Sequence, residues 1–327
     1  MRSSGHLILL VLVTGNYFIK FKISDMDKKL KIIVIGHITL DEFEGNLIPG
    51  GSAYYCSQTY LALGAEVKLI SIVGDDFQFN EVFTGMDVFV KRMGKTTQFK
   101  NIYEKDSPRK QISLAQAESI RPDEIPEDFK ECDVLHLVPV LGEVDISQWV
   151  SCIKSMLVAV GLQGWLRRIN PSKVVLSKKC DISNEEYKSI NLLCMSEDDI
   201  KGQPELLEKV VKLVPVVALT HGAKGYDLYR NGVKNSYGVF RTFEVDPTGA
   251  GDVFASGLVH SLAAGKPDTE SGYIGAGLAS VIVEEVGGKA LKRIGEGVSR
   301  AKFISTDNSK TADFIAQPDI HYSEVIK

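Results

Sequence analysis

Short apolar runs alternate with stretches of helical periodicity along most of the chain. The runs are Lys31–Ile35, Asp133–Val138, Met156–Val160, Leu192–Met195 and Val214–Leu219. Continuous apolar runs of this length are typical of strands buried on both faces of a parallel sheet. A helix is predicted from Asp252 onward, because the apolar residues that follow it share one stripe. The alternation predicts an α/β fold, a three-layer sandwich around a mostly parallel central sheet.

Local signals predict two hairpins and one helix start. The segments Thr97–Glu104 and Gln111–Ala117 are extended and are separated by a polar loop, which is the pattern of a β-hairpin. Asn231-Gly232 between two further extended segments predicts a tight hairpin turn. Earlier in the chain a helix is predicted to begin at Ser52, with that serine as its N-cap.

Composition and charge narrow the classes of function. With 327 residues, 44% of them apolar, the chain can form one sizeable α/β domain with an accessory element. The net charge is −4 and both signs are interspersed, so neither nucleic acid nor a membrane surface is indicated as a partner. The cysteines are Cys56, Cys132, Cys152, Cys180 and Cys194, which lack zinc-site spacing. Their odd number favours reduced thiols in a reducing compartment.

The N-terminal segment differs from the rest of the chain. Its apolar run Leu7–Val13 resembles the core of a signal peptide but is far too short to span a bilayer. Met26 then begins an ordinary approach to the first buried strand. We therefore expect residues 1–25 to be an upstream extension or a mis-called start, and residues 26–300 to form the main domain. Residues 301–327 are expected to be a tail without periodicity.

A glycine-rich turn opens the predicted helix at Asp252. It reads Asp246-Pro247-Thr248-Gly249-Ala250-Gly251-Asp252. Such a turn points backbone N–H groups and the positive end of the helix dipole at one spot, where an anion such as phosphate binds. Asp252 at the rim suits phosphoryl transfer, since a carboxylate can take the proton of an attacking hydroxyl. Spacing alone also allows Asp252 to be only a partner of the helix dipole.

This turn resembles the C-terminal signature of the ribokinase-like (PfkB) carbohydrate kinases. The resemblance implies that Asp252 is the catalytic base. It also implies that Gly249, Ala250 and Gly251 form the anion hole for the transferred phosphate. The corresponding fold is the ribokinase-like version of the predicted sandwich, with a small β lid over the substrate.

The resemblance gives the lid its expected position. In this family it would comprise about residues 41–48 and 96–117, and a homodimer would form through it. A weaker similarity to inositol-kinase-like members comes from Gln163 and Arg167, which follow a predicted strand. Arg167 could pair with a phosphate or be an ordinary surface residue.

The N-terminal signature of the family is matched by Gly50-Gly51 and Gly64. The resemblance implies that Asp41 accepts hydrogen bonds from substrate hydroxyls. Gly50 and Gly51 would let the substrate lie against backbone N–H groups. Most members have Asn where this chain has Tyr55, so we expect Tyr55 to offer the substrate a ring and to disfavour ribose and fructose.

Residues for ATP and Mg²⁺ are also implied by the resemblance. Thr220, Gly222 and Gly225 resemble the family's nucleotide-phosphate loop, and Thr248 of the C-terminal signature would join them. A second set lies at the end of a predicted strand and consists of Glu197, Asp198 and Asp199. Family members carry Asn-x-x-Glu there and order water around Mg²⁺, and the register leaves open which aspartate replaces the Glu. The same acids also suit a helix N-terminus.

Together these features predict an ATP- and Mg²⁺-dependent kinase that phosphorylates a hydroxyl of a small sugar or cyclitol. A nucleoside kinase of the same fold is the alternative, since Tyr54, Tyr55 or Phe99 could stack on a base. A non-catalytic sugar-binding protein is disfavoured, because Asp252 and the glycines of its turn are retained. An enzyme that uses ATP on a small molecule is expected in the cytoplasm.

Overall fold

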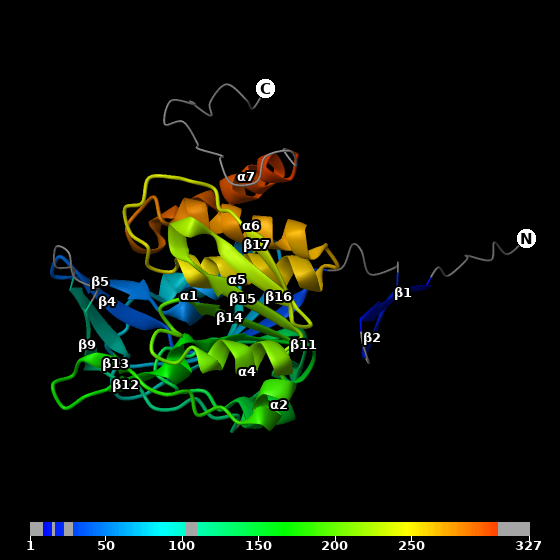
Figure 1. Ribbon diagram of the computed structural model, residues 1–327. Coiled ribbons are helices and arrows are strands. Elements are labelled where there is room, and N and C mark those ends of the chain that lie inside the picture. Colours follow the sequence, from blue (N-terminus) through cyan, green and yellow to red (C-terminus); the bar gives the residue numbers. More distant parts are fainter. Residues whose placement is uncertain (1–8, 15–16, 23–28, 103–109, 124, 307–327) are drawn as a thin grey trace, which may run out of the picture.

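The computed structural model describes residues 9–14, 17–22, 29–102, 110–123 and 125–306. A nine-stranded sheet forms the middle layer (Figure 1). Its strands are β3 (Lys31–Ile35), β6 (Glu66–Val73), β7 (Asp87–Arg92), β10 (Glu131–Leu137), β11 (Lys154–Gly161), β14 (Leu192–Ser196), β15 (Val216–Thr220), β16 (Tyr226–Arg230) and β17 (Val233–Tyr237). Their order across the sheet is β17-β16-β15-β14-β11-β10-β3-β6-β7.

Pairing in this sheet is parallel from β15 to β7 and antiparallel where β16 and β17 are added. Ile32, Ile33, Val34 and Ile35 of β3 are all fully buried, as continuous apolar runs require in a sheet that is covered on both faces. Asn231 and Gly232 form the predicted hairpin turn, with φ of 48° and 83°. The predicted α/β fold with a mostly parallel sheet is confirmed.

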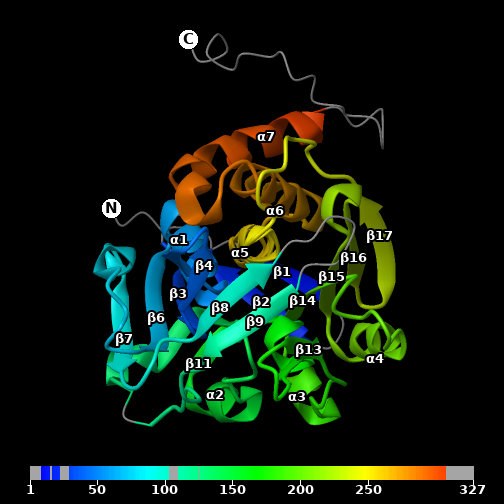
Figure 2. The ribbon, with the colours of Figure 1, turned by 90° about the vertical axis from the view of Figure 1, so that its left-hand side faces the viewer.

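Helices cover both faces of the sheet (Figures 1 and 2). On one face lie α1 (Ser52–Ala62), α5 (Ala250–Ala263) and α6 (Asp268–Ile282), with α7 (Ile294–Thr306) outside α6. On the other face lie α2 (Ile146–Cys152), α3 (Asn184–Lys188) and α4 (Glu205–Leu213). Each side has its own apolar core, represented by Tyr60 and Leu258 on the first face and by Trp149 and Tyr187 on the second.

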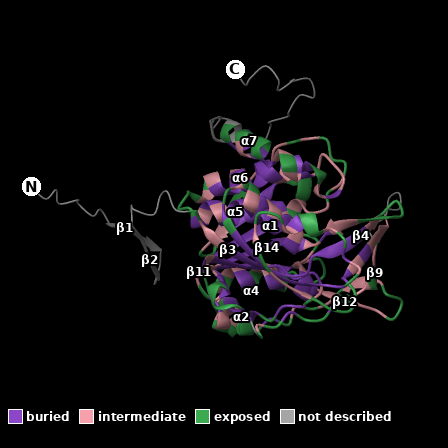
Figure 3. Ribbon diagram, turned by 180° about the vertical axis from the view of Figure 1, so that it is seen from behind, coloured by how far each residue is buried: buried purple, intermediate pink, exposed green. Residues whose placement is uncertain are grey.

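Short 3₁₀ helices connect several of these elements. They are η2 (Asn80–Phe83), η3 (Glu127–Phe129), η4 (Leu162–Leu166), η5 (Gly222–Lys224) and η6 (Gly287–Arg293). Figure 3 shows that the buried residues concentrate in the central sheet and on the helix faces that cover it. The connections at the carboxyl ends of the parallel strands are the places where α/β folds hold their ligands.

A second, four-stranded sheet stands at the edge of the body, and we call it the lid. Its strands are β4 (Thr39–Phe43), β5 (Asn46–Gly50), β8 (Gln98–Ile102) and β9 (Lys110–Ala115), in the order β5-β4-β8-β9. A short hairpin of β12 (Arg167–Ile169) and β13 (Val175–Ser177) continues beside β9 through a bridge between Ile112 and Val174. The lid and the hairpin beside it therefore bring segments from three parts of the chain to one end of the central sheet.

The structure corrects two expectations about element boundaries. Helix α7 runs through the boundary predicted at residue 300 and ends at Thr306, so the main domain includes part of the predicted tail. Gly51, with φ of 85°, is the N-cap of α1, and the Ser52 side chain does not cap the helix. Within the described part of the chain, no helix combines the length and apolarity needed to cross a membrane.

The N-terminal segment contains β1 (Leu9–Thr14) and β2 (Tyr17–Lys22), which pair with each other as a separate antiparallel sheet. The rest of the predicted extension lies outside the described residues. We predict that a chain beginning at Met26 unfolds at the same temperature as the full chain, because residues 1–25 lack the pattern of a core element. Thermal unfolding of both chains checks this, and a large drop in Tm would show that the extension packs on the domain.

Candidate active site

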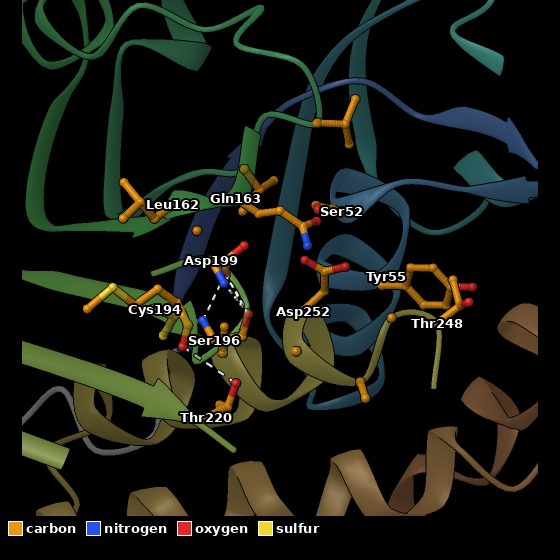
Figure 4. A pocket seen from close by; sticks show the side chains of 18 of the residues that line it. Ser52, Tyr55, Leu162, Gln163, Cys194, Ser196, Asp199, Thr220, Thr248 and Asp252 are labelled. Atoms are coloured by element: carbon orange, nitrogen blue, oxygen red, sulfur yellow. Dashed lines mark hydrogen bonds between the residues drawn. The ribbon is translucent and has the colours of Figure 1, made fainter. Parts of the chain in front are cut away.

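A cavity of 350 Å³ lies between the glycine turn, the carboxyl ends of the parallel strands and the lid. Its lining includes every predicted catalytic residue, namely Gly249, Ala250, Gly251 and Asp252. Of the predicted substrate residues it includes Asp41, Gly51 and Tyr55. Figure 4 shows Asp252 at the centre of this cavity, pointing toward Ser52 and Gln163. The fold thus brings together residues that are about 200 positions apart in the sequence.

The glycine turn is built as a helix N-terminus. Gly249, with a left-handed φ of 82°, is the N-cap of α5, and Asp252 lies in the first helical turn. Asp246 stabilises the turn, because its carboxylate accepts hydrogen bonds from the backbone N–H groups of Thr248 (3.0 Å) and Gly287 (2.9 Å). The first N–H groups of an α-helix lack intrahelical acceptors and carry the positive end of its dipole. The turn therefore presents a fixed anion-binding surface to the cavity.

Tyr55 packs directly against this turn. A Cβ atom on Gly249 would lie 2.5 Å from the Tyr55 ring, and Tyr55 is only 1% exposed. Burial raises the pKa of Tyr55 well above its ordinary value, with a further contribution from the charge of Asp41. Figure 4 shows its ring beside Thr248. Most of the Tyr55 ring packs against other protein groups. A substrate can therefore contact less of the ring than we expected from the sequence.

Polar side chains line the opposite end of the cavity. Asp41 is 9% exposed and accepts a hydrogen bond from Thr39 Oγ1 (2.9 Å). A Cβ on Gly50 would lie 2.5 Å from an oxygen of Asp41, so this position needs glycine beside that carboxylate. Further polar residues on this wall are Ser52, Asn101, Gln111, Gln163 and Arg167. Asn101 and Gln111 are hydrogen-bonded to each other across the lid strands at 2.9 Å.

Sequence reasoning missed Asn101 and Gln111 as site residues, and it connected Gln163 and Arg167 with the site only through the weaker resemblance to inositol-kinase-like members. Asn101 and Gln111 come from β8 and β9, and their local sequence carries no motif that would mark them. Gln163 and Arg167 come from η4 and β12. The predicted hairpin placed Asn101 and Gln111 on a lid, so the alternation of their side chains was the one usable signal.

The floor of the cavity is uncharged. His136 of β10 is fully buried, and its ring is hydrogen-bonded to the Tyr60 hydroxyl at 2.8 Å. Burial lowers the pKa of His136 to about 3, so the imidazole is neutral. Burial also raises the pKa of Cys194 to about 12, and that of Cys56 well above its ordinary value. These three floor residues, His136, Cys56 and Cys194, are therefore uncharged at neutral pH.

A second cavity of 450 Å³ lies on the other side of the glycine turn. The two cavities share Thr220, Gly222, Pro247, Ala250 and Gly251 in their linings. Most of the second lining is apolar and includes Val239, Phe240, Phe254, Ala276 and Val283. The two spaces consequently meet at the turn, one with a polar wall and one with an apolar wall.

The predicted phosphate loop follows β15 at this junction. Thr220 and Gly222 line both cavities, Gly225 lines the second, and Thr248 lines the first. His221 lies between two carboxylates, 3.1 Å from Glu197 and 3.0 Å from Asp227. The phosphate loop is thereby joined to the acidic segment at the end of β14.

The predicted metal residues are adjacent but do not converge. Asp199 accepts hydrogen bonds from the backbone and hydroxyl of Ser196, both at 2.8 Å. The hydrogen bond with His221 is the main cause that lowers the pKa of Glu197. Asp198 is exposed and lines the cavity. The described residues contain no group of three or more His, Cys, Asp or Glu that could hold a metal ion directly. Glu197, Asp198 and Asp199 all line the cavity, and Mg²⁺ held by this segment through water stays a prediction.

Comparisons with known proteins agree with this geometry. The model of the pfkB carbohydrate kinase family matches residues 180–293. The chain is 25% identical to the cytidine kinase of Thermococcus kodakarensis, over 79% of this chain and 98% of that protein. It is also 25% identical to the inositol 3-kinase of Arabidopsis thaliana, over 79% of this chain and 75% of that protein.

Two solved structures share the fold. One is a pyrophosphate-dependent kinase of the ribokinase family complexed with a pyrophosphate analogue and myo-inositol. It has a TM-score of 0.66 and 19% identity, and the match covers 81% of this chain and 99% of that one. The other is the Arabidopsis thaliana ribokinase with ribose and ATP, with a TM-score of 0.63, 18% identity and coverage of 84% and 99%. The predicted resemblance is confirmed, because residues 180–293 carry the pattern of the pfkB carbohydrate kinases on the ribokinase-family fold.

Proposed function

We propose that this chain is an ATP-dependent kinase that transfers the γ-phosphate to a hydroxyl of a small sugar or cyclitol. The observation that carries the proposal is the position of the glycine turn. Asp252 and the turn lie where a polar cavity and an apolar cavity meet. An acceptor on the polar side and a nucleotide on the apolar side would place hydroxyl and phosphate at one point, which is what phosphoryl transfer requires.

The chain's own groups have defined tasks in this reaction. Asp252 takes the proton of the attacking hydroxyl, and the neutral floor around it leaves that carboxylate as the base. The backbone N–H groups of Gly249–Asp252 stabilise the charge on the moving phosphoryl group. Thr220, Gly222, Gly225 and Thr248 hold the phosphates of the donor. Mg²⁺, held through water by the acidic segment, would neutralise charge on those phosphates.

The second cavity favours ATP over pyrophosphate as the donor. Pyrophosphate has no group that an apolar wall would bind, whereas a purine ring gains from burial against apolar and aromatic side chains. Phe240, Phe254 and Val283 provide such a wall beyond the glycine turn. An apolar space of 450 Å³ in that position suits a nucleotide base.

The polar wall of the first cavity favours a polyol as the acceptor. Asp41 can accept hydrogen bonds from a ring of hydroxyl groups, and the amides of Asn101, Gln111 and Gln163 can both donate and accept them. A nucleoside is the second candidate, because the cytidine kinase is among the similar proteins. Tyr55 and Phe99 are 1% and 3% exposed, so little aromatic face is offered for stacking on a base. This favours a cyclitol or sugar over a nucleoside.

An acceptor panel tests this choice. We predict that kcat/KM with ATP is higher for myo-inositol than for ribose, fructose or adenosine, because Tyr55 replaces an amide that reads a fixed sugar hydroxyl. Tyr55→Asn should shift the ranking toward ribose or fructose, by roughly 5- to 150-fold for one polar contact in a buried site. Tyr54→Asn is the control, since Tyr54 is the neighbouring ring and lines neither cavity. A higher kcat/KM for ribose or fructose than for myo-inositol in the unmodified chain would contradict the prediction. The same order of kcat/KM values in Tyr55→Asn would also contradict it.

Two finer features complete the proposal. Exposed apolar side chains on the lid, Phe43, Leu47 and Leu114, support a homodimer that pairs through the lid.

All five cysteines have free thiols, which suits a reducing compartment, and ATP is available in the cytoplasm. We therefore place the enzyme in the cytoplasm as a homodimer that acts on small molecules.

A further inference from the structure

A buried arginine of the last described helix reaches the wall of the second cavity. Arg300 of α7 is 7% exposed. Its guanidinium donates hydrogen bonds to Ser280 Oγ of α6 at 2.9 Å and to Glu284 Oε1 at 2.7 Å. A planar guanidinium that makes such directed bonds while buried holds its neighbours in fixed positions. Arg300 therefore fixes the outer helix to α6 at one defined place.

The segment that Arg300 approaches is residues 238–247, which has no regular secondary structure. Phe240 and Thr242 of this segment line the second cavity. The guanidinium carbon of Arg300 lies 5.2 Å from the centre of the Phe240 ring, within the range of a cation–π contact. The Thr242 hydroxyl donates to Oε1 of Glu284, the same oxygen that Arg300 binds. Both cavity residues are thus tied to one ionic cluster.

The cluster is suited to hold the wall in place. Burial alone would raise the pKa of Glu284, but the hydrogen bonds from Thr242 and Arg300 lower it, so the carboxylate is ionised. The far end of the segment is tied separately, because the N–H groups of Val245 and Asp246 donate to the carbonyl of Val283. Between β17 and Val245, Phe240 contacts Arg300 and Thr242 contacts Glu284, so the ion pair holds the segment at both of these cavity residues.

We propose that Arg300 is a positioning residue for the donor nucleotide. Arg300 would hold Phe240 and Thr242 in place against the nucleotide base. The inference rests on the proposed use of ATP. It assigns the last helix a part in donor binding, although no atom of Arg300 lines the cavity. A purely structural ion cluster would instead stabilise the fold and leave the choice between donors unchanged.

The test compares Arg300→Met with the unmodified chain by calorimetric titration of ATP and of tripolyphosphate, a probe with phosphates and no base. ATP should bind roughly 3- to 30-fold more weakly, which is typical of residues that act through others. Tripolyphosphate affinity should stay unchanged, because the phosphate loop and glycine turn are untouched. In steady-state kinetics the KM for ATP should rise, while kcat and the KM for the acceptor remain as they were.

Arg293→Met is the matched control. Arg293 binds the other oxygen of Glu284 at 2.8 Å, but its side chain is 32% exposed, and the cation–π contact with Phe240 is made by Arg300. Thr242→Val tests the same link from the cavity side if Arg300→Met does not fold, and should weaken ATP in the same selective way. Unchanged ATP affinity in Arg300→Met, or equal losses for ATP and tripolyphosphate, would overturn the inference. If the unmodified chain bound ATP no more tightly than tripolyphosphate, the base would contribute nothing to affinity. That result would instead overturn the proposal that ATP is the donor.

Discussion

We expect the Asp252→Asn variant to show a kcat lower by about 10²-fold or more, with ATP affinity retained. Asparagine keeps the size and shape of the side chain but cannot take the proton of the acceptor hydroxyl. The surrounding floor offers no substitute, because His136 has a pKa of about 3 and the pKa of Cys194 is about 12. The measurement is kcat with saturating ATP and acceptor, together with the Kd for ATP.

The chain offers a matched control for this variant. Asp268 also lies in the first turn of a helix, α6, where it pairs with Arg230 and lines neither cavity. Asp268→Asn removes a dipole partner without removing a base, so it should affect stability slightly and kcat hardly at all. If both variants kept kcat within a factor of a few of the unmodified chain, Asp252 would be a dipole partner and not the base.

The second large effect is expected for Gly249→Ala. Alanine at a φ of 82° costs about 1–3 kcal/mol of stability, and its Cβ would lie 2.5 Å from the Tyr55 ring. Either the ring or the turn must move. Since a displacement of about 1 Å in a catalytic group can cost 10²-fold in rate, we expect kcat to fall by roughly that factor. Thermal unfolding and kcat are measured on the same preparation.

Gly265→Ala separates the backbone cost from the contact with Tyr55. Gly265 has a φ of 79° just beyond the other end of α5, and no atom lies within 4 Å of its added Cβ. Gly265→Ala should lose about 1–2 kcal/mol of stability and keep its activity. Adding Tyr55→Ala to Gly249→Ala should recover part of the lost stability, because the clash is removed. A Gly249→Ala variant with normal kcat would show that the turn tolerates displacement and does not form a fixed anion hole.

The fold and the centre of the site could be predicted from local patterns. Continuous apolar runs marked the strands, and the Asp246–Asp252 stretch is a turn whose geometry follows from its own glycines and proline. Asn101 and Gln111 could not be found, because only the tertiary arrangement of the lid brings them to the cavity. The packing of Tyr55 against Gly249 was hidden for the same reason. Residues 301–306 were predicted as part of a tail, and the structure shows them as the end of α7, directly after the buried Arg300.

The most direct test of the central claim is transfer of labelled γ-phosphate from ATP to myo-inositol by the purified chain, with the product identified by mass. The proposed function predicts a phosphorylated acceptor formed in equal amount to ADP, and its loss in Asp252→Asn. Extending the same assay to ribose, fructose and adenosine covers the other acceptors. The account would be contradicted if none of these acceptors became phosphorylated, whether ATP was hydrolysed to free phosphate or was not consumed at all.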